Sequence, residues 1–344
     1  MTSDNLPLLT NKTHGYDKND PAATFEPFFH YNEDMSAWEF FKHSIMAWTL
    51  FPIRYVVGWL SVFLCLLFTA IFAIGRDNEH GTVSTRRYGI FRFIGRIFTR
   101  FQLLTYGFYW LNVEGEQHVG PNGEKYGIVA NHVSWVDILV VSTTAFPAYV
   151  AKSAIRDTPG VGLLAKMWGC YFLDRDDPLA RQHLIENIQQ RASDPTLPPI
   201  AIFPEGTTTR AQFMMNFKKG AFTAGTPVQP MLLLYTGNNN SVAWDTNSLF
   251  NAMFRVGTQF YNKVTIKYLP VYYPNDAEKA DAVLYANNVR KYMEKSSGGK
   301  LQSVDLRYRH KKIFEDYLSS KIEWGELLDK MDHPDYTIEK SPLF

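Results

Sequence analysis

The feature that most constrains the fold is a run of twenty uncharged residues at positions 55–74, YVVGWLSVFLCLLFTAIFAI, bounded by Arg54 and Arg76. At about 1.5 Å per residue, a helix of this length extends about 30 Å, which is the thickness of the hydrocarbon core of a bilayer. A helix of a soluble protein rarely stays apolar on all sides over such a length. The run therefore predicts a membrane-inserted helix.

Two modes of insertion are open. The preceding segment is also apolar and aromatic, but Pro52 and Arg54 interrupt it. Residues 44–76 therefore fit either a single span with an interfacial lead-in or a hairpin of two helices that returns to the same side. The arginines that follow the run are Arg76, Arg86, Arg87, Arg92, Arg96 and Arg100. Under the positive-inside rule, they place the rest of the chain in the cytosol.

Residues 77–104 have a basic amphipathic pattern. Arg92, Arg96 and Arg100 recur every four residues within GIFRFIGRIFTRFQLL, and apolar residues recur between them at helical spacing. This is typical of an interfacial helix whose guanidinium groups bind lipid phosphates. A core helix with a solvated arginine stripe is the alternative. We expect an interfacial segment.

Charge and cysteine content exclude several classes of protein. A formal net charge of +1 gives no support for a nucleic-acid partner. Cys65 and Cys170 form neither a disulfide framework nor a metal-ligand spacing, so we expect no metal site. Residues 1–43 begin as a polar stretch without the layout of a signal peptide, and we expect a disordered tail.

Strand-like and helix-like segments alternate from about residue 105 onward. Examples are YGIVA and PIAIF, which read as strands, and PLARQHLIENIQQRA, which reads as a helix. Alternation of this kind predicts an α/β fold with a mixed, largely parallel sheet flanked by helices. We expect this domain to cover residues 105–275. Residues 276–344 read as a helical, charged C-terminal extension.

A histidine and an aspartate, His132 and Asp137, lie in the apolar stretch ANHVSWVDIL. In a regular helix they would point about 140° apart, so they meet only if the chain turns between them. A strand-to-helix junction between YGIVA and DILVV supplies such a turn. Alternatively, Ser134 caps the helix and Asp137 is the acid of a capping box. We expect Asp137 to hydrogen-bond His132 in preference to the cap.

A second polar cluster follows a predicted strand in AIFPEGTTTR, residues 201–210. Its glycine turn, hydroxyl groups and terminal Arg210 suit a phosphate or another oxyanion. Arg175 ends another strand-like segment, GCYFLDR. Polar groups at several strand ends predict one site at the edge of a sheet.

Four segments, NHVSWVD, GCYFLDR, FPEGTTTR and PVQP, resemble in order and spacing the four motifs of the glycerolipid acyltransferases. These enzymes transfer an acyl chain from acyl-CoA to lysophospholipids or glycerol 3-phosphate. The resemblance covers about residues 105–275. The hydroxyl-rich EGTTT looks most like the branch that acts on lysophosphatidylcholine and lysophosphatidylethanolamine. Arg210 departs from that branch, which often has asparagine there.

The resemblance implies a role for each motif. His132 would be the general base that takes the proton from the acceptor hydroxyl, and Asp137 would hold its imidazole. Acyl-CoA would be a co-substrate, with no further cofactor. The residues expected to bind the acceptor are Arg175, Glu205, Gly206, Thr207, Ser134 and Pro230. We expect Glu205 to orient an arginine or a hydroxyl. Lys218 and Lys219 are candidates to face CoA phosphates, and the alternative is that they are ordinary exposed surface lysines.

The predicted activity is therefore acyl transfer from acyl-CoA to a lysophospholipid at a membrane. Three alternatives stay open: a lysophosphatidic acid acyltransferase, a CoA-independent transacylase, and a catalytically weak lipid-binding protein. A metal-dependent hydrolase is disfavoured, because no further ligands cluster with His132 and Asp137. We expect an integral membrane protein of the endoplasmic reticulum or Golgi. The acceptor headgroup, the acyl-chain preference and the oligomeric state do not follow from the sequence.

Overall fold

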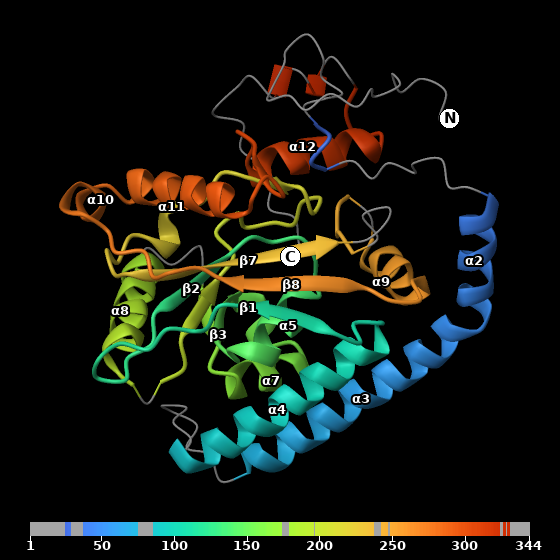
Figure 1. The fold of residues 1–344 in the computed structure, drawn as a ribbon, viewed down its shortest axis with the longest axis horizontal. Helices are drawn as coiled ribbons and strands as arrows, with labels where there is room; N and C mark the ends of the chain where they lie inside the picture. Colours follow the sequence, from blue (N-terminus) through green and yellow to red (C-terminus); the bar gives the residue numbers. More distant parts are fainter. Residues whose placement is uncertain are drawn as a thin grey trace.

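A computed structural model describes residues 25–28, 37–74, 85–173, 179–195, 197–236, 242–246, 248–323, 326–327 and 329–330. Its centre is a seven-stranded sheet in the order β1-β8-β7-β2-β5-β3-β4 (Figure 1). The strands are β1 (Leu111–Glu114), β2 (Gly127–Ala130), β3 (Ala148–Lys152), β4 (Tyr171–Leu173), β5 (Ile200–Ile202), β7 (Val228–Thr236) and β8 (Lys263–Tyr268). Neighbouring strands are parallel except β7 and β8. The expected mixed, largely parallel sheet is confirmed.

The direction of the strands decides where a site can form. β7, β2, β5, β3 and β4 are mutually parallel neighbours, so their carboxyl ends lie along one edge of the sheet. The motifs NHVSWVD and FPEGTTTR follow β2 and β5, GCYFLDR contains β4, and PVQP contains the start of β7. Segments far apart in the sequence are thereby brought together, as they are in other open α/β sheets.

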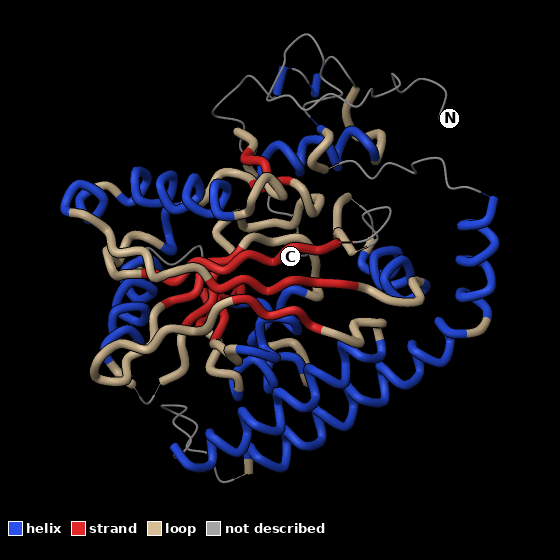
Figure 2. The backbone as a smooth tube through the Cα atoms, in the orientation of Figure 1, coloured by secondary structure: helices blue, strands red, loops and turns tan. Residues whose placement is uncertain are grey.

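Helices cover both faces of the sheet (Figure 2). The helices after α3 (Leu50–Ala73) are α4 (Thr85–Thr105), α5 (Asp137–Thr144), α6 (Ser153–Arg156), α7 (Val161–Met167), α8 (Ala180–Ser193), α9 (Leu249–Thr258), α10 (Asp276–Ala280), α11 (Ala282–Ser296) and α12 (Tyr308–Leu318). A short 3-10 helix, η2 (Lys219–Ala221), and a small second sheet of β6 (Phe213–Met214) and β9 (Gln302–Ser303) complete the domain.

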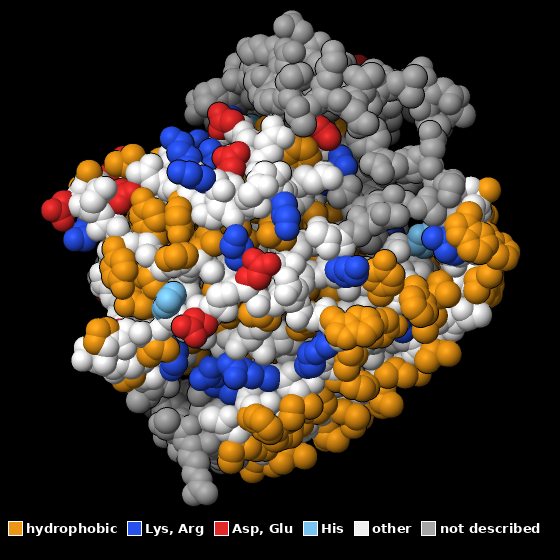
Figure 3. Space-filling view, in the orientation of Figure 1, with side chains coloured by type: hydrophobic (Ala, Val, Ile, Leu, Met, Phe, Trp, Pro, Cys, Tyr) orange, Lys and Arg blue, Asp and Glu red, His pale blue; other side chains and the backbone are white. Residues whose placement is uncertain are grey.

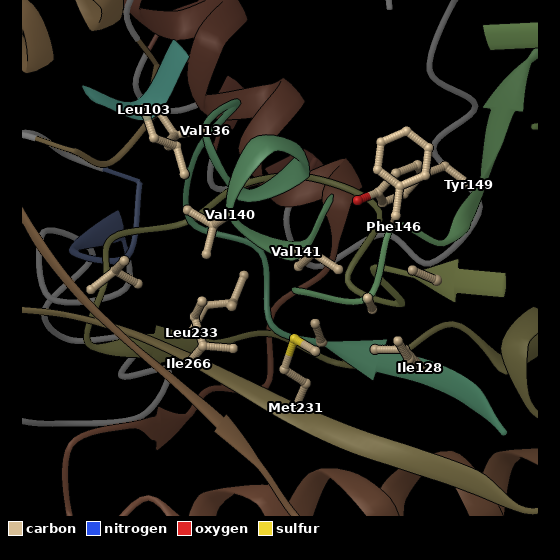
Figure 4. Packing of buried hydrophobic residues seen from close by; sticks show 14 of the residues in the cluster. Leu103, Ile128, Val136, Val140, Val141, Phe146, Tyr149, Met231, Leu233 and Ile266 are labelled. Carbon is tan, nitrogen blue, oxygen red and sulfur yellow. The ribbon is translucent and has the colours of Figure 1, made fainter. Parts of the chain in front are cut away.

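Alternate side chains of β7 enter two different cores. Met231 and Leu233 pack in the cluster that contains α5, whereas Leu232 and Leu234 pack in the cluster that contains α11. Figure 4 shows Val140 of α5 above Leu233 and other sheet residues. A central strand with both faces buried must be apolar on both faces. This explains the unbroken MLLL of β7.

The predicted membrane helix is α3 (Leu50–Ala73), preceded by α2 (Ala37–Trp48). In the described part of the chain, α3 is the one helix long and apolar enough to cross a membrane. It runs without a break through Pro52, because a proline in the first helical turn removes no intrahelical hydrogen bond. The hairpin alternative within residues 44–76 is therefore not what forms. Instead, α3 packs beside α4, where Phe68 and Phe91 stack (Figure 1).

The arginine stripe of α4 faces the α/β domain. Arg92 donates a hydrogen bond to the carbonyl oxygen of Ala145 at 3.2 Å. Arg100 donates to the carbonyl oxygens of Phe108 and Tyr109 at 2.7 and 2.6 Å. These side chains bind the protein backbone, so the predicted use of this stripe on lipid phosphates is wrong for Arg92 and Arg100. The exposed large apolar residues of α4 are Ile90, Phe93, Ile97, Phe101 and Leu104.

Two parts of the predicted disordered tail are structured. Phe25 and Phe28 are buried in a cluster with α12, and Phe25 stacks on Phe314 at 4.4 Å between ring centroids. In addition, α2 begins at Ala37. Aromatic residues within a polar stretch find a burial partner almost three hundred residues away, as Phe25 does in Phe314. A local reading of composition does not detect such a partner.

Candidate active site

The site begins where β2 ends. Asn131 follows the strand, and its side chain accepts the N–H of Leu233 at 2.8 Å and donates to the Leu233 carbonyl at 3.0 Å. These two hydrogen bonds fix the end of β2 to β7. The next residues are not helical, and α5 begins at Asp137, so Ser134 is not at its N-cap position. His132 therefore stands at the carboxyl edge of the sheet, within the expected strand-to-helix junction.

The chain turns so that His132 and Asp137 meet. Nδ1 of His132 lies 2.7 Å from Oδ2 of Asp137. The carboxylate is fully buried, and the His132 side chain is 19% exposed. A carboxylate oxygen can only accept here, which assigns the proton to Nδ1 and leaves Nε2 as an acceptor. Among the described residues, Nε2 has no hydrogen-bond partner, and it is the atom available to a substrate.

Asp137 also serves the backbone, so the two roles considered from the sequence are compatible. Its Oδ2 accepts the N–H groups of Val133 at 2.7 Å and of Ser134 at 2.9 Å. The Ser134 hydroxyl makes no hydrogen bond to the described residues and does not cap α5. The acid therefore organises both the imidazole and the loop that carries it.

A fourth donor to this carboxylate was not predicted. The hydroxyl of Tyr235 donates to Oδ1 of Asp137 at 2.5 Å. Burial and the negative charge of Asp137 raise the pKa of Tyr235 well above its usual value, so the phenol keeps its proton. Its position at the end of β7 is the signal that could have revealed it, because that strand end meets the same sheet edge.

Aromatic rings hold the imidazole from one side. Phe203, the residue after β5, stacks on His132 with 4.2 Å between ring centroids and 16° between planes. Tyr149 stacks on Phe203 in turn, at 6.3 Å. The ring of His132 is thus fixed by a hydrogen bond at Nδ1 and by packing against its face.

Glu205 lies beneath the site. It is buried, and its two carboxylate oxygens accept the N–H groups of His132 and Met215, both at 2.8 Å. Burial raises its pKa to about 8, against the opposing effect of the two N–H donors. The expectation that Glu205 orients an arginine or a hydroxyl is wrong, because both of its oxygens hold backbone. Thr209 adds a hydrogen bond from its N–H to the His132 carbonyl at 3.1 Å.

Only part of the EGTTT loop reaches the surface. Gly206 is exposed and Thr207 is half-buried, whereas Thr208 and Thr209 are buried. Gly206 has a φ of 72°, a left-handed conformation that favours glycine. A Cβ at Gly206 would lie 2.2 Å from Nζ of Lys218, so the ammonium group of Lys218 covers this glycine. The loop therefore presents Gly206, Thr207 and a lysine together.

The structure gives less support for substrate contact by the remaining predicted residues. Arg175 lies outside the described residues. Lys219 is exposed within η2. Ser134 is fully buried, and Pro230 is buried within β7 opposite Val129. Their roles toward a substrate stay predictions.

Arg210 is not offered to a substrate. Arg210 is 3% exposed, its guanidinium group pairs with Glu26 at 3.4 Å, and its backbone N–H donates to the carbonyl of Pro27. The sequence suggested that this arginine would help to bind an oxyanion. In the structure it instead holds the N-terminal segment against the loop.

The chemistry available is proton transfer at Nε2 of His132. A neutral imidazole backed by a buried carboxylate removes a proton from a hydroxyl and is stabilised when it becomes charged. Within the described residues, no three His, Cys, Asp or Glu side chains lie close enough together to hold a metal ion.

Comparisons with known proteins agree with the motifs. A family model described as Acyltransferase matches residues 111–234. The chain is 33% identical to the lysophospholipid acyltransferase LPEAT1 of Arabidopsis thaliana, over 82% of this chain and 81% of that protein. It is 34% identical to a lysophosphatidylcholine acyltransferase of Drosophila melanogaster, over 79% of this chain. It spans about half of that animal relative, 52% of its length.

The fold is shared with a solved acyltransferase structure. It is the 1-acyl-sn-glycerophosphate acyltransferase PlsC of Thermotoga maritima, with a TM-score of 0.52 over 74% of this chain and 98% of that chain. Its sequence identity to this chain is 20%, so the likeness concerns the fold alone.

Proposed function

This chain belongs to the glycerolipid acyltransferase family, and we propose that it is a membrane-bound enzyme that moves a fatty acyl chain from acyl-CoA to the free hydroxyl of a lysophospholipid. The observation that carries this proposal is the contact of His132 Nδ1 with the buried Asp137, which leaves Nε2 available at the sheet edge. The acceptors we propose are lysophosphatidylcholine and lysophosphatidylethanolamine.

In the proposed reaction, Nε2 of His132 takes the proton of the acceptor hydroxyl as its oxygen attacks the thioester carbon. Asp137 stabilises the imidazolium that forms. The new C–O ester bond then replaces the C–S bond, and the proton passes from Nε2 to the departing CoA sulfur. A well-placed general base of this kind contributes about 10²–10⁴-fold to the rate.

The acceptor phosphate would bind at the exposed part of the EGTTT loop. Gly206 and Thr207 supply backbone and hydroxyl donors there, and Lys218 supplies a positive charge beside them. We propose the phosphate of the acceptor or of CoA as the partner of Lys218. No metal or further cofactor takes part in this scheme.

The membrane attachment fits a reaction whose lipid substrate and product both reside in a bilayer. α3 is long enough and apolar enough to span one, by length and composition. We propose that the α/β domain faces the cytosol, because arginines follow the apolar run. The endoplasmic reticulum or the Golgi is the proposed location.

The test is an assay of the purified full chain in lipid nanodiscs with labelled oleoyl-CoA. Lysophosphatidylcholine, lysophosphatidylethanolamine and lysophosphatidic acid are offered separately, and both CoA thiol release and labelled phospholipid are measured. We expect diacyl product with the first two acceptors, unchanged by a metal chelator. Product with lysophosphatidic acid alone would overturn the acceptor class, and thiol release without lipid product would indicate a hydrolase.

A further inference from the structure

A buried lysine from the C-terminal part of the chain reaches the loops around the active site. Lys311 lies on α12, beyond the residues that match the acyltransferase family model, and it is 4% exposed. Its Nζ donates to the carbonyl oxygen of Thr208 at 3.0 Å and to the Thr208 hydroxyl at 3.1 Å. A third bond goes to the carbonyl oxygen of Trp244 at 3.3 Å. Three donors of one ammonium group thus meet three acceptors on two loops.

Both loops hold the backbone of the general base. The residue after Thr208, Thr209, donates its N–H to the carbonyl of His132 at 3.1 Å. Trp244 itself donates its N–H to the carbonyl of Val133 at 2.9 Å. Each loop is therefore anchored at Lys311 on one side and at the His132–Val133 backbone on the other. The Thr208 hydroxyl also donates to the Trp244 carbonyl, which ties the two loops to each other.

We propose that Lys311 is a positioning residue of the active site, which holds His132 in its reactive place by clamping the Thr208 and Trp244 loops together. This inference rests on the proposed acyl transfer. Lys311 touches no reacting atom in this scheme. It acts through Thr209 and Trp244, whose N–H groups fix the two carbonyls that follow Asn131.

Burial of an ammonium group is unfavourable, which sets this lysine apart from a packing residue. Burial lowers the pKa of Lys311 to about 8, although Glu315, Asp245 and Glu205 act in the opposite direction. The three atoms that it contacts are uncharged oxygens. An apolar side chain of similar length would fill the same space without this desolvation cost. The ammonium group contributes what an apolar side chain cannot, namely directed bonds to both loops.

The neighbouring residue provides a matched control. Lys312 is on the same helix but pairs with Asp316 at 3.1 Å and Glu315 at 3.9 Å, both on α12. Its side chain is thus engaged within its own helix and not with the site loops. Lys312→Met removes the same charge from the same helix. Any effect of net charge or of helix propensity appears in both lysine variants, whereas loss of the clamp appears only in Lys311→Met.

The experiment compares Lys311→Met, Lys312→Met and Thr208→Val with the wild-type full chain in nanodiscs. The steady-state kcat, the KM for oleoyl-CoA and the KM for lysophosphatidylcholine are measured and normalised to the folded fraction. We expect Lys311→Met to lower kcat about 10-fold, which is about 1.4 kcal/mol of activation free energy, with both KM values within about twofold of wild type. Lys312→Met should leave all three constants unchanged.

Thr208→Val keeps the test decisive if Lys311→Met does not fold. It removes one of the three acceptors together with the hydroxyl's own bond to the Trp244 carbonyl, and it leaves the ammonium group bound to two carbonyls. We expect a fall in kcat of about threefold, with KM unchanged. A kcat within experimental error of wild type in Thr208→Val, or a loss in Lys311→Met that appears only in KM, would overturn the positioning role.

Amide hydrogen exchange separates this inference from the proposed function. In Lys311→Met, peptides that contain Thr209 and Trp244 should exchange faster, while peptides of α11 should not change. If the wild-type chain transfers no acyl group, the proposed function fails but this exchange result still decides whether the clamp exists. Unchanged exchange in both loops would overturn the clamp even in an active enzyme.

Discussion

At the scale of single residues, the account depends on one carboxylate. Asp137 is fully buried and accepts hydrogen bonds from four donors: His132, Val133, Ser134 and Tyr235. Four donors offset the cost of burying the charge and fix the direction of both oxygens. The imidazole is therefore held in one tautomer and one orientation before any substrate binds. This arrangement reduces the reorganisation that proton transfer would otherwise require.

The part of this network that lies close in sequence could be predicted, and the rest could not. His132 and Asp137 are five positions apart, so the need for a turn between them is visible locally. Tyr235 is separated from Asp137 by 98 positions, and its contact requires β7 to lie beside β2. Glu205 is a predicted substrate contact, but the structure buries it beneath His132. This burial depends on the same sheet order, which the sequence does not show.

Tyr235→Phe should slow the reaction without changing the fold. The variant removes one donor to Asp137 and leaves the aromatic ring in place. Since a hydrogen bond to a charged group is worth about 1.5–3 kcal/mol, we expect kcat to fall about 10-fold, with KM nearly constant. The measurement is the steady-state rate of CoA release and lipid formation. Wild-type kcat in this variant would show that the phenol is dispensable. Tyr261→Phe, at an exposed tyrosine, is the control.

At the scale of elements, periodicity identified helices better than it identified their inner and outer faces. The sequence of α4 shows both an arginine stripe and an apolar stripe, and either could have faced lipid. In the structure, Arg92 and Arg100 turn to backbone carbonyl oxygens and donate hydrogen bonds to them. The sequence pattern does not identify α9 and α12 as separate helices. Their contacts, with Arg54 and with the Thr208 loop, join segments that are far apart in the sequence.

Arg54, near the start of α3, joins this helix to the end of α9. From the sequence it is a charge that interrupts an apolar segment. In the structure it lies in the second turn of α3 and donates to the carbonyl oxygens of Gly257 and Phe260, at 2.8 and 2.9 Å. A cation at the carboxyl end of α9 satisfies carbonyls that the helix leaves free. The helix α3 is thereby fastened to the α/β domain.

The docking of α12 should weaken in acid. His310 is buried there, and its Nδ1 accepts the N–H of Arg307 at 3.0 Å. Burial and the charges of Arg309 and Arg307 lower the pKa of His310 to about 4 from 6.5, with Asp305 opposing. A depressed pKa means that the stabilisation is fully present above about pH 6.5 and is lost as the pH falls through about 4.

The measurement is the thermal midpoint of wild type and His310→Asn between pH 7.5 and 4.0. Asparagine keeps an acceptor for the Arg307 N–H but does not titrate. We expect the wild-type advantage to shrink by several degrees as the pH falls across this window. A difference that is constant with pH would contradict the assignment of this transition to His310.

At the scale of the whole molecule, apolar side chains form a band along the edge built by α2, α3 and α4 (Figure 3). The exposed large apolar residues of α3 are Ile53, Val56, Trp59, Leu60, Phe63, Leu64, Leu67 and Ile71. Patches of this extent on a protein surface mark a membrane or protein contact. Together with the length and composition of α3, the band fits a bilayer.

Charges placed in this band should release the protein from membranes. Phe63→Glu combined with Leu67→Glu puts two carboxylates on the exposed face of α3. By analogy with other charges at a bilayer centre, each carboxylate raises the free energy of membrane insertion by about 2.5–3.5 kcal/mol. We expect the double variant to leave the carbonate-washed membrane fraction. The matched control, Val283→Glu with Leu284→Glu, changes two exposed residues of α11 and should stay membrane-bound. Equal retention of both double variants would contradict the assignment of the band.

The most direct test of the whole account is the activity of His132→Ala. The variant removes Nε2, the proposed proton acceptor, from a folded and membrane-bound chain. Purified wild type, His132→Ala and the control His118→Ala, at an exposed histidine, are compared for CoA release and diacyl product. We predict that His132→Ala loses about 10²–10⁴-fold in kcat and that His118→Ala keeps wild-type activity. A His132→Ala enzyme that retains more than a tenth of wild-type kcat would contradict the general-base mechanism.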